Sequence, residues 1–156
     1  MIFLRTRAGI GIGILTLCAA AAPAAAQRLE LSVDPSAIVI QAGDPDAMPV
    51  ASSTPVAVNY RVRQNNEETW ALTVQANGDL DTGGSTIDIS AVSWTATPAP
   101  PFRNGTLSKA VVQTVATGVG SVPSPSTGTI IFRLTNSWSY DAGIYTQVLV
   151  FTLSTP

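Results

Sequence analysis

Short runs in which apolar residues occupy every second position constrain the fold of this chain more than any other feature. Residues 56–63 alternate apolar side chains with polar or small ones, and residues 70–76 repeat the pattern after a polar turn. Successive side chains of a β-strand point to opposite faces, so a period of two indicates a strand with one buried face. The two runs, joined by a short turn, predict a β-hairpin.

The same kind of run recurs along the rest of the chain, without a convincing helical period. The further runs share the alternation or the composition of strands, and they cover residues 29–33, 37–40, 87–94, 107–117, 129–134 and 143–154. Turn residues separate them, and the prolines between residues 97 and 101 end one run because proline has no amide hydrogen for a ladder. About seven or eight strands at this spacing predict an all-β fold, an immunoglobulin-like antiparallel β-sandwich, with a small barrel as the alternative closure.

Two irregularities in the pattern lead to further predictions. Apolar residues change from odd to even positions between Ala91 and Val92, which predicts a bulge or a change of sheet there. The run 107–117 alternates poorly and is interpreted as an edge strand. Residues 118–128 contain two prolines and are expected to form a loop.

The N-terminus has the organisation of a secretory signal peptide. Two arginines precede an apolar stretch, and Ala24 and Ala26 provide small residues just before Gln27. We therefore expect residues 1–26 to be removed and residues 27–156 to form one exported domain, located in the periplasm, at the cell surface or outside the cell. The apolar stretch is shorter than the roughly 20 residues of a membrane-spanning helix, so no transmembrane segment is expected in the mature chain.

Composition limits the chemistry open to the mature chain. The single cysteine, Cys18, lies within the predicted signal, and the chain has no histidine. Leu17 stands where a lipoprotein signal has a small residue, which argues against lipidation of Cys18. Without cysteine and histidine there is no Ser-His-Asp triad, thiolate nucleophile or Cys/His zinc site, so we expect no enzyme activity.

The charge of the mature chain argues against nucleic acid as a partner. Ten acidic residues face six basic ones, once Arg5 and Arg7 are subtracted from the total of eight. A nucleic-acid-binding domain carries a basic stripe or patch, and the sequence has none.

Tyr140 to Tyr145, with the sequence YDAGIY, resembles the tyrosine corner of immunoglobulin-type domains. In that motif the Asp and Gly make a turn, and the second tyrosine donates a hydrogen bond back to the backbone. Gln147 stands where true immunoglobulin domains have a cysteine. The resemblance is therefore local to this segment.

The C-terminal pattern of an aromatic residue, Gly, Tyr and alternating apolar residues is also similar to secreted spore-coat-U-type and other pilin-like domains. The resemblance implies a structural subunit of a surface assembly, completed by an N-terminal strand from a neighbouring subunit. Its partners would be copies of itself or other surface proteins. Leu29, Leu31 and Val33 directly follow the predicted cleavage site and are the candidate donor strand. The alternative is that they form the first strand of their own domain. The cysteines of the family are absent here.

A loop rich in acidic residues is the best candidate metal site. Asn77, Asp79, Asp81 and Asp88 have the spacing of positions 1, 3, 5 and 12 of an EF-hand loop, whose oxygens bind Ca²⁺. Thr82 replaces the glycine that such loops need at position 6. A polar β-turn is the competing interpretation, because Asp and Gly are common turn residues.

The aromatic residues suggest a second function, a carbohydrate- or ligand-binding module. Trp70 and Trp94 are in phase with apolar strand positions and are expected in the core. Trp138 and Tyr140 lie in a polar stretch and are the candidate binding residues, since aromatic faces stack on sugar rings.

Overall fold

The computed structural model describes the backbone of residues 2–8 and all of residues 28–155. Cys18, the apolar part of the predicted signal and its cleavage site lie outside these residues. No helix in the described part of the chain has the length and apolarity to cross a membrane. The elements are β1 (Ile2–Ala8), β2 (Arg28–Asp34), β3 (Ala37–Ile38), β4 (Val50–Ser52), β5 (Val56–Arg63), β6 (Thr69–Ala76), β7 (Leu80–Asp81), β8 (Thr86–Ile87), the 3₁₀ helix η1 (Ile89–Ala91), β9 (Val92–Thr97), β10 (Gly105–Thr106), β11 (Gln113–Val119), β12 (Val122–Thr135) and β13 (Gln147–Ser154).

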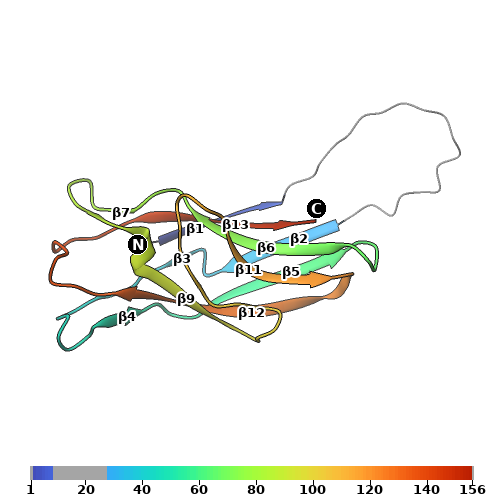
Figure 1. Cartoon of the computed structure of the whole chain (residues 1–156), viewed down its shortest axis with the longest axis horizontal. Helices are drawn as coiled ribbons and strands as arrows, with labels where there is room; N and C mark the ends of the chain where they lie inside the picture. The colour runs from blue at the N-terminus through green and yellow to red at the C-terminus, as the bar shows by residue number, and fades with distance from the viewer. Residues whose placement is uncertain (1, 9–27, 156) are drawn as a thin grey trace, which may run out of the picture.

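Most strands belong to two sheets that pack face to face (Figure 1). One sheet has the order β11-β6-β13-β1-β3, and the other has the order β10-β9-β12-β5-β2 with β4 paired to β12. β7 and β8 form a separate ribbon. Among these strands, only β1 and β13 pair in parallel. The predicted all-β sandwich is confirmed.

Alternation correctly predicts which side chains face the core. The apolar positions of β5 and β6 are at most 4% exposed, while the residues between them are half-buried; the buried set is Val56, Val58, Tyr60, Val62, Trp70, Leu72, Val74 and Ala76. The two sheets therefore bury one face each, and the core lies between them.

β5 and β6 do not form the predicted hairpin. β5 pairs with β2 and β12 in one sheet, whereas β6 pairs with β11 and β13 in the other. The connection between them crosses from sheet to sheet, and the Gln64 side chain holds it by donating to the carbonyls of Glu68 (2.7 Å) and Gly120 (3.2 Å). The hairpin prediction was wrong because alternation specifies the buried face of a strand but not its neighbour.

The change of apolar parity marks a change of sheet, as predicted. η1 separates β8, in the small ribbon, from β9, in the larger sheet. The Asp88 side chain accepts a hydrogen bond from the amide of Ser90 at 2.8 Å and begins this helical turn. Ile89 and Val92, on either side of the parity change, are both buried.

The segment after η1 and β9 differs from the prediction in part. Only the C-terminal part of the run 107–117 is a strand, β11, which lies at a sheet edge as predicted. Residues 118–128 are not a loop: a tight turn at Gly120, with φ +74°, leads directly into β12. β12 accommodates Pro123 and Pro125 because its ladder with β5 is interrupted over this stretch, so no proline amide is required.

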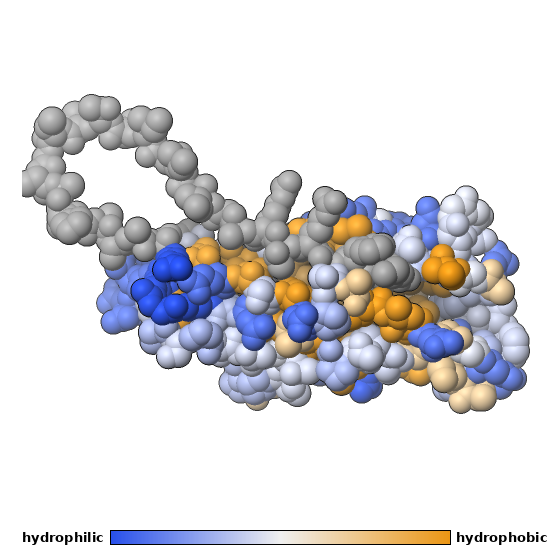
Figure 2. All heavy atoms as spheres, turned by 180° about the vertical axis from the view of Figure 1, so that it is seen from behind, coloured by the Kyte–Doolittle hydropathy of each residue, from blue (hydrophilic) through white to orange (hydrophobic). Residues whose placement is uncertain are grey.

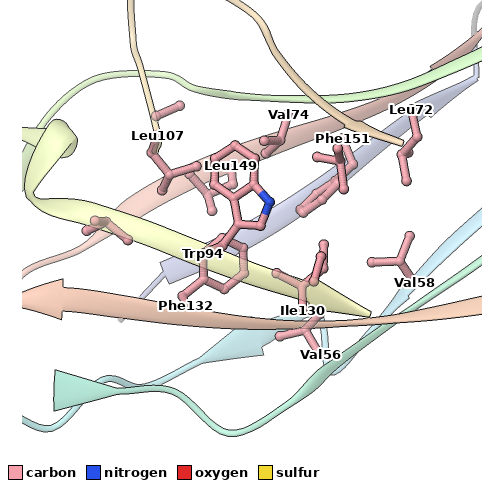
Figure 3. Close-up of a cluster of buried hydrophobic side chains, with 14 of the residues drawn as sticks. Val56, Val58, Leu72, Val74, Trp94, Leu107, Ile130, Phe132, Leu149 and Phe151 are labelled. Carbon is pink, nitrogen blue, oxygen red and sulfur yellow. The ribbon is translucent and has the colours of Figure 1, made fainter. Parts of the chain in front are cut away.

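Aromatic side chains fill the middle of the core (Figure 3). Trp70 and Trp94 are 3% and 2% exposed, which confirms their predicted place. The Trp94 indole donates to the carbonyl of Arg103 at 2.8 Å, so its one polar atom has a partner. In β12, a Cβ at Gly128 would overlap the Phe102 ring, so this strand position needs glycine for close approach.

β1 lies in the sheet between β13 and β3. It runs parallel to β13, from Ile2 opposite Gln147 to Ala8 opposite Leu153, and meets β3 in antiparallel pairing at its start. These residues belong to the segment that the sequence predicts to be removed.

Candidate functional site

The side of β13 that pairs with β1, called the outer edge of β13 below, is the candidate functional site. β13 has β6 on one side and β1 on the other. On the β6 side, the amide of Asn77 donates to the carbonyl of Val148 at 3.0 Å. Along a strand, the backbone groups of successive residues point alternately to the two neighbours. The amides and carbonyls of Leu149, Phe151 and Leu153 therefore face β1.

The side chains of these three residues are part of the core. Each is 0% exposed. β1 also lies close to β2 of the opposite sheet, so it closes the sandwich along this edge. From behind, apolar side chains form a band along the length of the sandwich (Figure 2). Removal of β1 would leave backbone groups of β13 without partners and uncover apolar surface, the two properties of an edge that pairs with another chain.

The candidate donor residues occupy a different place. Leu29, Leu31 and Val33 lie in β2, which pairs with β5 from Arg28 opposite Arg63 to Asp34 opposite Ala57, and their half-buried side chains pack against the core. The Glu30 carboxylate on this strand forms two ion pairs: Oε1 lies 2.8 Å from Nε of Arg28, and Oε2 lies 3.8 Å from Nη1 of Arg61. The structure thus gives these residues the alternative arrangement, the first strand of their own domain. A donor role would require β2 to leave its sheet.

The predicted tyrosine corner is present where the chain enters β13. The Tyr145 hydroxyl donates to the carbonyl of Asp141 at 3.0 Å. Next to it, Thr146 and Asp81 exchange backbone hydrogen bonds of 2.8 and 3.1 Å, which tie the entry of β13 to β7. The strand itself begins only at Gln147, so the corner shortens the run predicted from residue 143.

Gln147 makes a structural contact that sequence reasoning missed. Its side-chain amide donates to the carbonyl of Asp79, and its side-chain oxygen accepts from the amide of Val148 at 2.7 Å. It therefore anchors the start of β13 to the acidic loop. No sequence signal identifies this role, because the partner lies 68 residues away.

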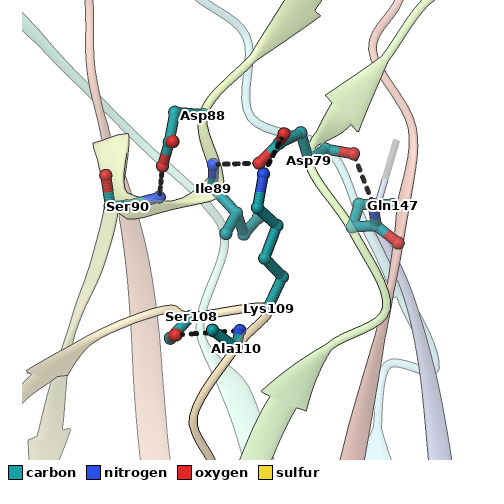
Figure 4. Close-up of polar contacts among 8 residues, drawn as sticks. All are labelled: Asp79, Asp88, Ile89, Ser90, Ser108, Lys109, Ala110 and Gln147. Atoms are coloured by element: carbon teal, nitrogen blue, oxygen red, sulfur yellow. Dashed lines mark hydrogen bonds and ion pairs between the residues drawn. The ribbon is translucent and has the colours of Figure 1, made fainter.

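The carboxylates of the acidic loop are hydrogen-bonded to backbone amides and to the ammonium group of Lys109 (Figure 4). Asp79 accepts from the amide of Ile89 at 3.1 Å and pairs with the Lys109 ammonium at 2.5 Å. The hydrogen bond from Lys109 is the main cause that lowers the pKa of Asp79, and the same bond raises the pKa of Lys109. Hydrogen bonds from Ser90 lower the pKa of Asp88.

These bonds favour the β-turn interpretation of the loop. Asp81 accepts from the amide of Gly83 at 2.7 Å, as in an Asx turn. Within residues 28–155, no three His, Cys, Asp or Glu side chains form a group that could hold a metal ion. Asn77, Asp79, Asp81 and Asp88 are not brought together as an EF-hand would require, and calcium binding stays an untested prediction.

The two candidate aromatic residues line one concavity at an end of the sandwich. Its volume is about 680 Å³, and both Trp138 and Tyr140 contribute to its wall. The Trp138 side chain is 68% exposed, whereas Tyr140 is half-buried and packs against the core. Leu80, Ile87 and Leu134, all buried, lie beneath it.

No protein-family model and no curated protein sequence matches this chain. The similarity to spore-coat-U-type and pilin-like domains stays a prediction.

Proposed function

We propose that this chain is an exported structural subunit of a surface assembly, in which the outer edge of β13 accepts a strand from a neighbouring molecule. One observation carries the proposal: the strand beside β13 is made of residues 2–8, which precede the predicted cleavage site. Export would remove this strand and leave its place in the sheet open.

The length of the pairing between β1 and β13 indicates that the ligand of this edge is an extended strand rather than a small molecule. β1 pairs with β13 from Gln147 to Leu153, which is all but the last residue of β13. A strand added to a sheet edge gains affinity from main-chain hydrogen bonds and specificity from alternate side chains. The backbone of Leu149, Phe151 and Leu153 would provide the first of these.

The arrangement of β2 limits what the donor can be. In the mature chain, β2 begins one residue after the predicted N-terminus and is paired along its whole length with β5. No free N-terminal arm would remain for donation. The donor is therefore either a strand of another surface protein or the β2 of a second copy that has left its own sheet.

A peptide test separates this proposal from a self-contained monomer. Mature protein, residues 27–156, is expected to form oligomers, measured by light scattering after gel filtration. A synthetic peptide with the sequence of residues 2–8 should bind and convert these oligomers to monomers, and a scrambled peptide of the same composition should not.

A folded monomer of residues 27–156 that ignores the peptide would overturn the proposal. Circular dichroism provides the folding control. A mature chain that folds only when the peptide is present would make residues 2–8 a permanent part of the fold and would also overturn the proposal.

A further inference from the structure

Exposed apolar side chains gather at one end of the sandwich. Of the eight large apolar side chains in the described residues that are at least 40% exposed, five lie in or directly beside two loops there: Val39, Met48, Val50, Trp138 and Ile144. These loops lie at the left of Figure 1, between β3 and β4 and between β12 and β13. An exposed apolar surface of this kind, around a concavity, is typical of a binding site.

From this site we propose that the concavity lined by Trp138 and Tyr140 binds a neutral carbohydrate. Its volume of about 680 Å³ is within the range of roughly 300–1,000 Å³ of small-ligand pockets. This function goes beyond strand acceptance and does not depend on it.

Trp138 is held in place as a stacking surface. Its indole nitrogen donates to the Asp46 side chain at 3.2 Å. Asn136, two residues before Trp138, donates through its side-chain amide to the carbonyls of Gly43 (2.9 Å) and Met48 (3.1 Å). The two loops are thus tied together by three side-chain hydrogen bonds from residues 136–138 and by one backbone bond, from the amide of Asn136 to the carbonyl of Pro49 at 2.9 Å. A fixed, exposed ring with a negative face attracts the C–H groups of a sugar ring without an ordering cost on binding.

The polar groups of the concavity favour hydroxyl groups as partners. Gln41, Ser137 and Asp141 are part of the wall, and a carboxylate accepts strong hydrogen bonds from hydroxyl donors. Among the described residues that line the concavity, none is lysine or arginine. An acidic sugar or a phosphate would meet a carboxylate without a balancing cation, which disfavours an anionic ligand.

The experiment uses the full chain, in which β1 covers β13, so that the result is independent of assembly. Maltohexaose, cellohexaose, chitohexaose and mannohexaose are titrated against the protein and followed by NMR chemical shifts. At least one should bind with shifts in residues 136–145, and Trp138→Ala should weaken it roughly tenfold or more.

Val119→Ala is the matched control, because Val119 is exposed to a similar extent, 67%, and lies in β11 outside the concavity. It should leave the affinity unchanged. Oligogalacturonate, an anionic probe, should not bind. The proposal is overturned if none of the neutral oligosaccharides binds at millimolar concentration, or if Trp138→Ala binds as tightly as the unaltered protein. Shifts in the same residues on concentrating the protein alone, without sugar, would instead assign the surface to a second copy of this chain.

Discussion

The strands β1 and β2 lie close together at one side of the sandwich, yet they are held in different ways. β2 belongs to the predicted mature chain, pairs antiparallel with β5 and packs half-buried apolar side chains on the core. β1 belongs to the predicted signal and pairs parallel with β13. If residues 1–26 are removed as the sequence predicts, the β2 edge stays in place and the β13 edge becomes open.

Deletion of residues 28–34 should have the largest effect on folding. It removes Leu29, Leu31 and Val33 from the core, and full burial of each such side chain is worth about 1.5–3 kcal/mol, less for partial burial. We expect a loss of several kcal/mol in the free energy of unfolding, measured by urea denaturation of the full chain. Deletion of residues 1–26 is the comparison and should alter oligomeric state more than folding. Equal loss of folding in both variants would contradict the distinction between the two edges.

Gly128→Ala should destabilise the interior of the larger sheet. The new Cβ would overlap the Phe102 ring, and such overpacking costs about 1–3 kcal/mol. Gly84→Ala is the control, since no atom lies within 4 Å of its Cβ position. The midpoint temperature of thermal denaturation should fall for Gly128→Ala and stay unchanged for Gly84→Ala. This variant tests whether the β12 interior, unlike the β13 edge, depends on a close fit.

Hydrogen exchange of β13 sharpens the comparison residue by residue. After removal of residues 1–26, the amides of Leu149, Phe151 and Leu153 should exchange faster than those of Val150 and Thr152, which face β6. Assembly or the peptide of residues 2–8 should restore protection to the first set alone. NMR exchange rates in the two states provide the measurement, and equal rates along the strand would argue against an open edge.

Asp79→Asn should have the smallest effect, because the ion pair with Lys109 lies at the surface. The lowered pKa of Asp79 means that its contribution to stability is present above the unfolded pKa, near 3.8, and is lost as the pH falls through the folded value. The raised pKa of Lys109 gives a contribution that is lost as the pH rises through its folded value, above 10.5.

The melting temperature of Asp79→Asn should therefore fall slightly below that of the unaltered protein at neutral pH, and the difference should vanish in acid. Glu67→Gln, at an exposed turn position, is the control and should show no such pH dependence. A difference that persists below the folded pKa would mean that the side chain acts through the shape of the loop rather than through its charge.

The candidate sites were predictable to different extents. The tyrosine corner could be identified because both of its partners lie in one short segment, Asp141 to Tyr145. Trp138 and Tyr140 could be named, but not the loop around Asp46 that fixes the indole, since that contact spans 92 residues. The proposed acceptor edge could not be predicted, because nothing in the local pattern of residues 147–154 indicates which strand lies beside them.

The sequence alone was sufficient to identify the central strands β5, β6 and β9 and the face of each that is buried, because side chains alternate along an extended backbone whatever its neighbours are. Only the tertiary structure decided the neighbours. β5 and β6 have matching patterns and a short connection, yet they lie in different sheets, where each pairs with strands that are distant in the sequence. The same long-range pairing placed residues 2–8 beside β13, and so made this strand the proposed acceptor.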